Sequence, residues 1–236
     1  METYQEFLDR IHSFEKEDIY YGSDCFSGNS KIAEKVNRDN SFKDFYGDTI
    51  VFNLDDITKV SLAKLVEQLY QLVPECFCKK LSSSTLHMTL HDLSNASALQ
   101  DVASDFCQNE LKILKKTKEI DSNKRIKMKS TYIFNMCDIS LVLGLYPINE
   151  QEYNALMNLY YMFDDVKKLN YPFTPHITLA YYNRNGFDIV SARKLESIVS
   201  KFNKNQMEIE LDVNNLFYQR FTNMNDYTNI LCLGNN

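Results

Sequence analysis

The sequence of 236 residues contains no tryptophan, only six glycines and only four prolines. This scarcity of Gly and Pro excludes collagen-like and low-complexity chains, while 44% hydrophobic residues are enough for a packed core. The longest apolar run, Leu141–Ile148, is too short to cross a bilayer. The acidic start, Met1–Asp18, lacks the apolar core of a signal peptide. We therefore expect a globular, cytoplasmic protein without a membrane partner, and a monomer.

Positive charge is also in deficit, because 26 Lys and Arg face 32 Asp and Glu, for a formal net charge of −6. A protein that binds long nucleic-acid duplexes needs a basic face to neutralise many phosphates. The composition therefore argues against a long duplex partner but permits a small phosphate ligand.

The six cysteines show no paired metal-ligand spacing, since Cys76 and Cys78 are separated by one residue instead of two. We expect free thiols, no metal and no cofactor.

A strand–helix–strand order occurs twice along the chain. The β-branched and aromatic runs predict strands, and the apolar stripes at helical spacing predict helices; the first copy comprises Asp48–Leu54, Ser61–Val73 and Ser84–Leu90, and the second Ile139–Leu145, Asn149–Asp165 and Thr174–Tyr182. One offset of 89 residues relates the two copies. Such a repeat indicates two related lobes that each supply one strand to a common centre.

The remaining segments complete an α+β class. Helices are predicted at Gln5–Phe14, Leu99–Glu119 and Asp188–Phe202, a loop at Tyr20–Ser30, and strands at Ile126–Met136, Met207–Phe221 and Thr228–Leu233. We predict two facing antiparallel or mixed sheets with helices outside, arranged as a bilobal pseudo-two-fold domain over residues 48–236. Residues 1–47 form an N-terminal helix and loop extension to it.

The third strand of each copy carries the same short motif, His-x-Thr followed by an apolar residue. Alternate side chains on a strand share a face, so His87 points the same way as Thr89, and His176 the same way as Thr178. Two imidazoles with a pKa of about 6.5 can serve as acid and base near neutral pH. Two hydroxyls can hold phosphate oxygens, so the set suits displacement at a phosphodiester without a metal.

These two motifs, His87-Met-Thr-Leu90 and His176-Ile-Thr-Leu179, resemble the twin His-x-Thr/Ser motifs of the 2H phosphoesterase superfamily. The stretches Gly47–Phe52, Ser84–Leu93 and Phe173–Leu179 look most like an uncharacterised bacterial branch of that group. The resemblance covers roughly residues 45 to 235. It implies that His87 and His176 act as acid and base, and that the threonine of each motif binds the phosphate. Which histidine is the base stays open.

The strand pattern extends to residues outside the two motifs. Alternation from His176 places Tyr182 on the cleft face, where its ring could stack a base, and Arg220 lies on a late strand that could border the cleft. Both are candidate substrate-binding residues. For His91, we favour a strand-end residue bonded to Asp92 or solvent over a cleft position. A helix that presents His87 and His91 as metal ligands is opposed by the strand-like surroundings.

We therefore expect a metal-independent phosphodiesterase whose substrate is a 2',3'-cyclic phosphate, a 2'-5' linkage or a cyclic nucleotide. The principal alternative is a binding module with the same fold that holds a nucleotide or RNA end with little turnover. An RNA-end binding or ligating protein is a third alternative, which the acidic composition disfavours.

Overall fold

The computed structural model describes residues 2–16, 19, 25–204 and 206–234. Within these ranges the chain forms six α-helices, which are α1 (Tyr4–Ser13), α2 (Ile32–Lys35), α3 (Asp56–Leu72), α4 (Ala103–Lys116), α5 (Glu150–Tyr161) and α6 (Ile189–Phe202). The strands of the main sheet are β2 (Tyr46–Asn53), β3 (His87–Ala96), β4 (Arg125–Met136), β5 (Ser140–Pro147), β6 (His176–Tyr181), β8 (Glu208–Asp212), β9 (Leu216–Asn223) and β10 (Asp226–Cys232). A small sheet pairs β1 (Cys25–Phe26) with β7 (Phe187–Asp188).

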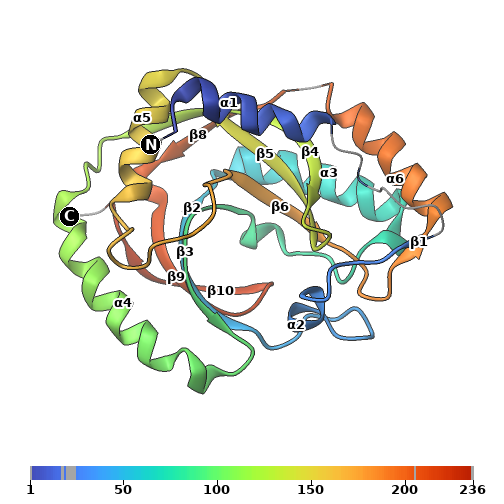
Figure 1. Ribbon diagram of the computed structural model, residues 1–236, viewed down its shortest axis with the longest axis horizontal. Helices are drawn as coiled ribbons and strands as arrows, with labels where there is room; N and C mark the ends of the chain where they lie inside the picture. Colours follow the sequence, from blue (N-terminus) through green and yellow to red (C-terminus); the bar gives the residue numbers. More distant parts are fainter. Residues whose placement is uncertain (1, 17–18, 20–24, 205, 235–236) are drawn as a thin grey trace.

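The eight main strands form one antiparallel sheet in the order β10-β9-β2-β3-β6-β5-β4-β8. The predicted α+β class is confirmed. The two predicted sheets are the two four-stranded halves of this sheet, and they meet where β3 lies beside β6 (Figure 1). Within the described part of the chain, the ladder between β3 and β6 has one register pair, Met88 opposite Ile177. The first-copy strands β2 and β3 therefore lie on one side of this seam, and the second-copy strands β5 and β6 lie on the other.

Helices cover the outside of the sheet, with α4 packed against β2, β3 and β9 and α1 beside α5 (Figure 1). Side-chain caps define where several helices begin: Asp55 accepts a hydrogen bond from the Thr58 N–H at α3, and Asn149 accepts one from Glu152 at α5. Val73 caps the end of α3, and Pro74 after it begins a short 3-10 turn. The tight turn between β4 and β5 places Cys137 and Asp138 at positive φ.

A buried carboxylate connects the first half of the sheet to α4. Asp48 is 1% exposed and accepts hydrogen bonds from the Ser94 N–H at 2.7 Å, the Asn109 amide at 2.9 Å and the Tyr218 hydroxyl at 2.9 Å. Burial raises the pKa of Asp48. Three donors on one buried acceptor hold β2, β3, β9 and α4 in a single register.

One predicted element is wrong: the strand predicted at Met207–Phe221 is two strands. A short 3-10 turn, Val213–Asn215, separates β8 from β9. The Asp212 carboxylate accepts a hydrogen bond from the Asn214 N–H and starts this turn. The break has a topological reason, because β8 pairs with β4 in one half whereas β9 pairs with β2 in the other.

The N-terminal segment packs against the second half of the sheet. Phe7 is fully buried and its ring lies 5.1 Å from that of Tyr153 on α5. The predicted loop Tyr20–Ser30 falls partly outside the described residues, which resume at Cys25 with β1. The division of the chain at residues 47 and 48 stays a prediction.

Candidate active site

The two motif strands run antiparallel through the seam of the sheet. With Met88 opposite Ile177, antiparallel register sets His87 opposite Thr178 and Thr89 opposite His176. Opposed side chains on one face have Cβ atoms about 4.5–5.5 Å apart, and diagonal neighbours about 7–8 Å. These four residues, which we call the twin-histidine site, therefore converge from positions 89 residues apart in the chain.

The exposure of the side chains confirms which of them point into the core and which point to the opposite face of the sheet. Met88 and Ile177 are 0% exposed, whereas the two histidines and two threonines between and beside them are half-buried. The alternation predicted from sequence therefore holds through both motifs.

Both histidines are held in the same way. The Nδ1 atom of His87 lies 2.7 Å from the carbonyl oxygen of Thr85, and that of His176 lies 2.7 Å from the carbonyl oxygen of Thr174. A carbonyl oxygen can only accept, so each Nδ1 carries the proton. Each neutral ring therefore presents a Nε2 lone pair on the face shared with the threonines, as a general base requires.

The reactive atoms of the site have no protein partner in the described part of the chain. No hydrogen bond joins Nε2 of either histidine, or the hydroxyl of Thr89 or Thr178, to another described residue. Half-buried polar atoms normally find a partner in the protein or in a ligand or solvent molecule. Two acceptors and two hydroxyls thus remain available to an external group of the size of a phosphate.

Burial governs the protonation of the pair. It lowers the pKa of His87 to about 4, opposed by the Thr85 hydrogen bond and aided by repulsion from His176. It also lowers the pKa of His176, where the Thr174 hydrogen bond and the charge of Asp92 act in the opposite direction. Without a ligand both imidazoles are therefore neutral at neutral pH. An anion between them would favour protonation of one ring.

A bulge comes directly after the threonine in each motif strand. The partners of β2 jump from Thr89 to His91, and those of β5 jump from Thr178 to Ala180, so Leu90 and Leu179 are the extra residues. The two bulges are related by the same offset as the motifs. A bulge places two residues of one strand opposite a single residue of its partner. After each bulge, the side chains that point to a given face of the sheet are therefore displaced by one residue.

The two bulges determine which residue after each motif points to the face of the sheet that carries the histidines. After Leu90 this residue is Asp92, which is exposed. Its carboxylate accepts a hydrogen bond from the Tyr171 hydroxyl at 2.8 Å. At the equivalent position beyond Leu179 stands Tyr181, which is 7% exposed. The sequence prediction missed both residues, because strict alternation selects their neighbours.

The placement of Tyr182 on the cleft face is therefore wrong. Its side chain is 0% exposed and packs among aromatic rings, with the ring of Phe26 at 4.7 Å and that of Phe77 at 6.2 Å. The bulge at Leu179 turns this side chain into the core. A fully buried ring cannot stack on a substrate base in this arrangement.

Arg220 is also directed away from the site. Its guanidinium pairs with Glu110 on α4 and lies 5.0 Å from the Phe106 ring. Tyr218, two residues earlier on the same face of β9, donates to Asp48 on the α4 side of the sheet. The proposed border position of Arg220 is wrong, because this residue lies on the opposite face from Thr89.

His91 contacts Asp92 and is directed away from the site face, as expected, but it is 1% exposed and lies within β3 and not at a strand end. Its Nδ1 atom lies 2.8 Å from the carbonyl oxygen of Asp92, and its Nε2 atom lies 3.6 Å from the Asp164 carboxylate. It belongs to strand β3, which excludes the helix that would present His87 and His91 together. No group of three or more His, Cys, Asp or Glu able to hold a metal occurs among the described residues.

No family model matches the sequence, and no curated protein matches it. Among solved structures, the conserved protein of unknown function ATU0111 from Agrobacterium tumefaciens is similar over 88% of this chain and 94% of its own, with a TM-score of 0.69 and 13% identity. The chain has the ATU0111 fold.

Weaker similarities extend to two other solved structures. One described as a phosphoesterase aligns over 78% of this chain and 95% of its own at a TM-score of 0.48 and 14% identity. E. coli LigT complexed with NADP+ aligns over 79% of this chain and 96% of its own at a TM-score of 0.43 and 14% identity.

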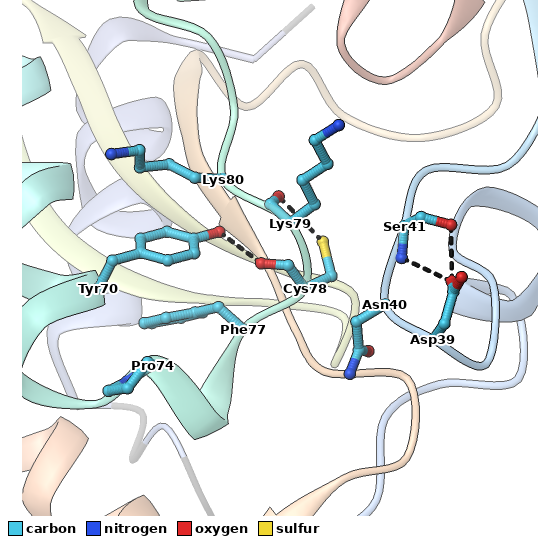
Figure 2. A pocket seen from close by; sticks show the side chains of 9 residues that line it. All are labelled: Asp39, Asn40, Ser41, Tyr70, Pro74, Phe77, Cys78, Lys79 and Lys80. Atoms are coloured by element: carbon cyan, nitrogen blue, oxygen red, sulfur yellow. Dashed lines mark hydrogen bonds between the residues drawn. The ribbon is translucent and has the colours of Figure 1, made fainter.

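Within this ATU0111-like fold, two surface pockets are separate from the twin-histidine site. One, of about 460 Å³, is lined by residues that include Tyr70, Cys78 and Lys79 (Figure 2). The other, of about 410 Å³, is lined by residues that include Arg125 and Glu152. Neither lining contains a motif histidine or threonine, so the chemistry argued above depends on the β3–β6 seam and not on these hollows. The described helices include none long and apolar enough to cross a membrane.

Proposed function

We propose that this protein is a metal-independent phosphodiesterase of the 2H type that acts on a nucleotide-type phosphodiester. One observation carries the proposal: two half-buried histidines, each with Nδ1 bound to a carbonyl oxygen two residues earlier, meet two threonines at the β3–β6 seam. The proposed substrates are a 2',3'-cyclic phosphate end, a 2'-5' linkage or a small cyclic nucleotide.

The proposed reaction is hydrolysis by paired acid–base catalysis. The Nε2 atom of the neutral histidine takes a proton from water as the water oxygen attacks phosphorus. The bond between phosphorus and one ribose oxygen breaks, and this oxygen takes the Nε2 proton of the other histidine, which is protonated at both nitrogens. The products are a phosphomonoester and a free hydroxyl. Thr89 and Thr178 donate to the non-bridging oxygens as negative charge builds up on them.

The reaction needs one protonated histidine, and burial disfavours this charged form. Burial lowers the pKa of both rings, so a proton must be taken up when the anionic phosphate binds between them. The charge of the phosphate favours the imidazolium. Turnover is therefore expected to increase below neutral pH.

The lowered pKa of both histidines also favours the second candidate, a module that binds a nucleotide or RNA end with little turnover. At neutral pH two neutral histidines supply a base but no acid. Such a protein would still hold a phosphate through its hydroxyls, because hydrogen bonding to the anion does not need the acid.

Hydrolysis of a panel of 2',3'-cyclic, 3',5'-cyclic and 2'-5'-linked nucleotides tests the proposal. We expect His87→Ala and His176→Ala each to lower kcat about 10²–10⁴-fold, and the double variant to lose little more, because the two residues act as one unit. His12→Ala, at a half-buried histidine on α1 away from the motifs, is the matched control and should retain activity. Activity should persist in EDTA. Wild-type protein that binds these nucleotides without cleaving any of them between pH 5 and 7 would favour the binding module instead.

A further inference from the structure

A lysine of the N-terminal segment reaches the site side of the sheet. Lys35, the last residue of α2, is half-buried. Its Nζ atom lies 5.4 Å from the ring centroid of Phe45 and 5.7 Å from that of Tyr181. The ammonium therefore lies over the faces of two aromatic rings, in the arrangement that attracts a cation.

Among the described residues, no carboxylate forms an ion pair with this ammonium within 4.0 Å. The ion pairs of the described residues involve other lysines, such as Lys80 with Glu67 and Lys116 with Asp165, and no hydrogen bond from Lys35 Nζ joins them. Burying a cation without an anion costs free energy, and burial accordingly lowers the pKa of Lys35. A site that keeps an unpaired ammonium next to aromatic rings is suited to an anion that arrives with a ligand.

The position of Tyr181 ties this lysine to the histidines. Tyr181 lies beyond the bulge on β6, on the face that carries His176 and Thr178. The charge of Lys35 lowers the pKa of His176, and the charge of Asp92 raises that of Lys35. Through its contact with Tyr181, the Lys35 ammonium therefore lies on the side of the sheet that carries the histidine pair.

We propose that Lys35 is a substrate-binding residue whose ammonium contacts a non-bridging oxygen of the substrate's phosphate, so that the N-terminal segment completes the active site. This inference rests on the proposed phosphodiesterase function. A phosphodiester carries one negative charge, which one ammonium neutralises. Lys35 moves no proton in the reaction.

The contact also makes the two halves of the site different, although the two His-x-Thr motifs are equivalent. The strand residue beside Lys35 is Tyr181, and the equivalent residue in the other half is the carboxylate Asp92. An anion is attracted by Lys35 and repelled by Asp92, and the Asp92 carboxylate can accept a hydrogen bond from a hydroxyl or amino group. The substrate class that fits is a phosphodiester with such a donor on one side only, as in a nucleoside cyclic phosphate.

Binding of inorganic phosphate, followed by calorimetry or ³¹P NMR at pH 6 and low salt, tests the contact. We expect Lys35→Met to weaken phosphate binding about 10-fold or more, in line with a charge-assisted hydrogen bond. Lys31→Met makes the same charge change at an exposed residue of the same segment and should leave the Kd within about twofold. With a cleaved nucleotide, Lys35→Met should raise KM by a similar factor and change kcat less, and Lys35→Arg should restore part of the affinity.

Thermal unfolding separates binding from a structural role. A Lys35→Met variant with a lowered Tm and an unchanged phosphate Kd would show that the aromatic contacts serve stability only, and would overturn the inference. Equal losses in Lys35→Met and Lys31→Met, or no phosphate binding by the wild type, would overturn it too. If Lys35→Met weakens phosphate binding but no nucleotide of the panel is cleaved, the inference about Lys35 stands and the proposed hydrolysis fails.

Discussion

His87 should titrate far below an ordinary histidine, and this is the most direct test of the site's electrostatics. A pKa of about 4 leaves about 1% of this ring protonated at pH 6, where a histidine with a pKa of 6.5 is about three-quarters protonated. The chain has four histidines, so their Cε1–H resonances can be followed by NMR and assigned with single variants. Inorganic phosphate should raise the apparent pKa of the pair, because an anion between the rings favours the charged form.

The same shift predicts how stability depends on pH. The folded-state pKa of His87 lies below its unfolded value of 6.5, so the unfolded chain binds more protons and stability decreases as pH falls from about 6.5 to about 4. The full shift corresponds to about 3 kcal/mol, and the exposed part of the ring reduces this to about 2 kcal/mol.

Urea unfolding at pH 7 and pH 4.5 measures this loss. The variant His87→Asn has no ring to protonate, so it should lose about 2 kcal/mol less than the wild type on acidification. A His87 resonance that titrates near 6.5 in the free protein, or an identical pH dependence in both proteins, would refute the claim that burial controls this residue.

Further predictions concern rate and packing. The profile of kcat/KM should be bell-shaped with its maximum above about 4 and below 6.5, since both histidine pKa values are lowered. Thr89→Val and Thr178→Val should each lower kcat about 10²-fold in the nucleotide assay, through loss of one donor to the phosphate. Asp48→Ala should cost about 3 kcal/mol in urea unfolding, because it leaves the Tyr218 hydroxyl and two other buried donors without their acceptor. Tyr182→Phe should leave activity unchanged and the free energy of unfolding equal or about 1 kcal/mol higher, because the buried Tyr182 hydroxyl has no partner among the described residues.

The wrong face predicted for Tyr182 has a physical origin in strand pairing. Alternation is a local property, so it correctly predicts that His87 and Thr89 share a face. It fails after a bulge, and a bulge exists because a strand pairs with its neighbour in a particular register. Strict alternation therefore assigns Tyr182 to the face that Tyr181 occupies. The extra residue at Leu179 is visible only when the partner strand β5 is in place.

Residues from distant segments that lie near the site could not be predicted from the sequence for a related reason. Lys35 and Tyr171 lie in stretches without a periodic pattern, and nothing local connects them to β3 or β6. Packing of α2 over Phe45 and Tyr181, and the hydrogen bond from Tyr171 to Asp92, bring them to the site.

By itself the sequence determined the α+β class, the repeated strand–helix–strand order and the two His-x-Thr pairs, because hydrophobic period and strand alternation depend on near neighbours along the chain. The tertiary structure alone decided that Met88 lies opposite Ile177, that the late segment splits into β8 and β9, and that Lys35 lies against Tyr181. These features depend on which strands pair and where the pairing slips, and pairing between residues far apart in the chain is settled only when the whole sheet packs.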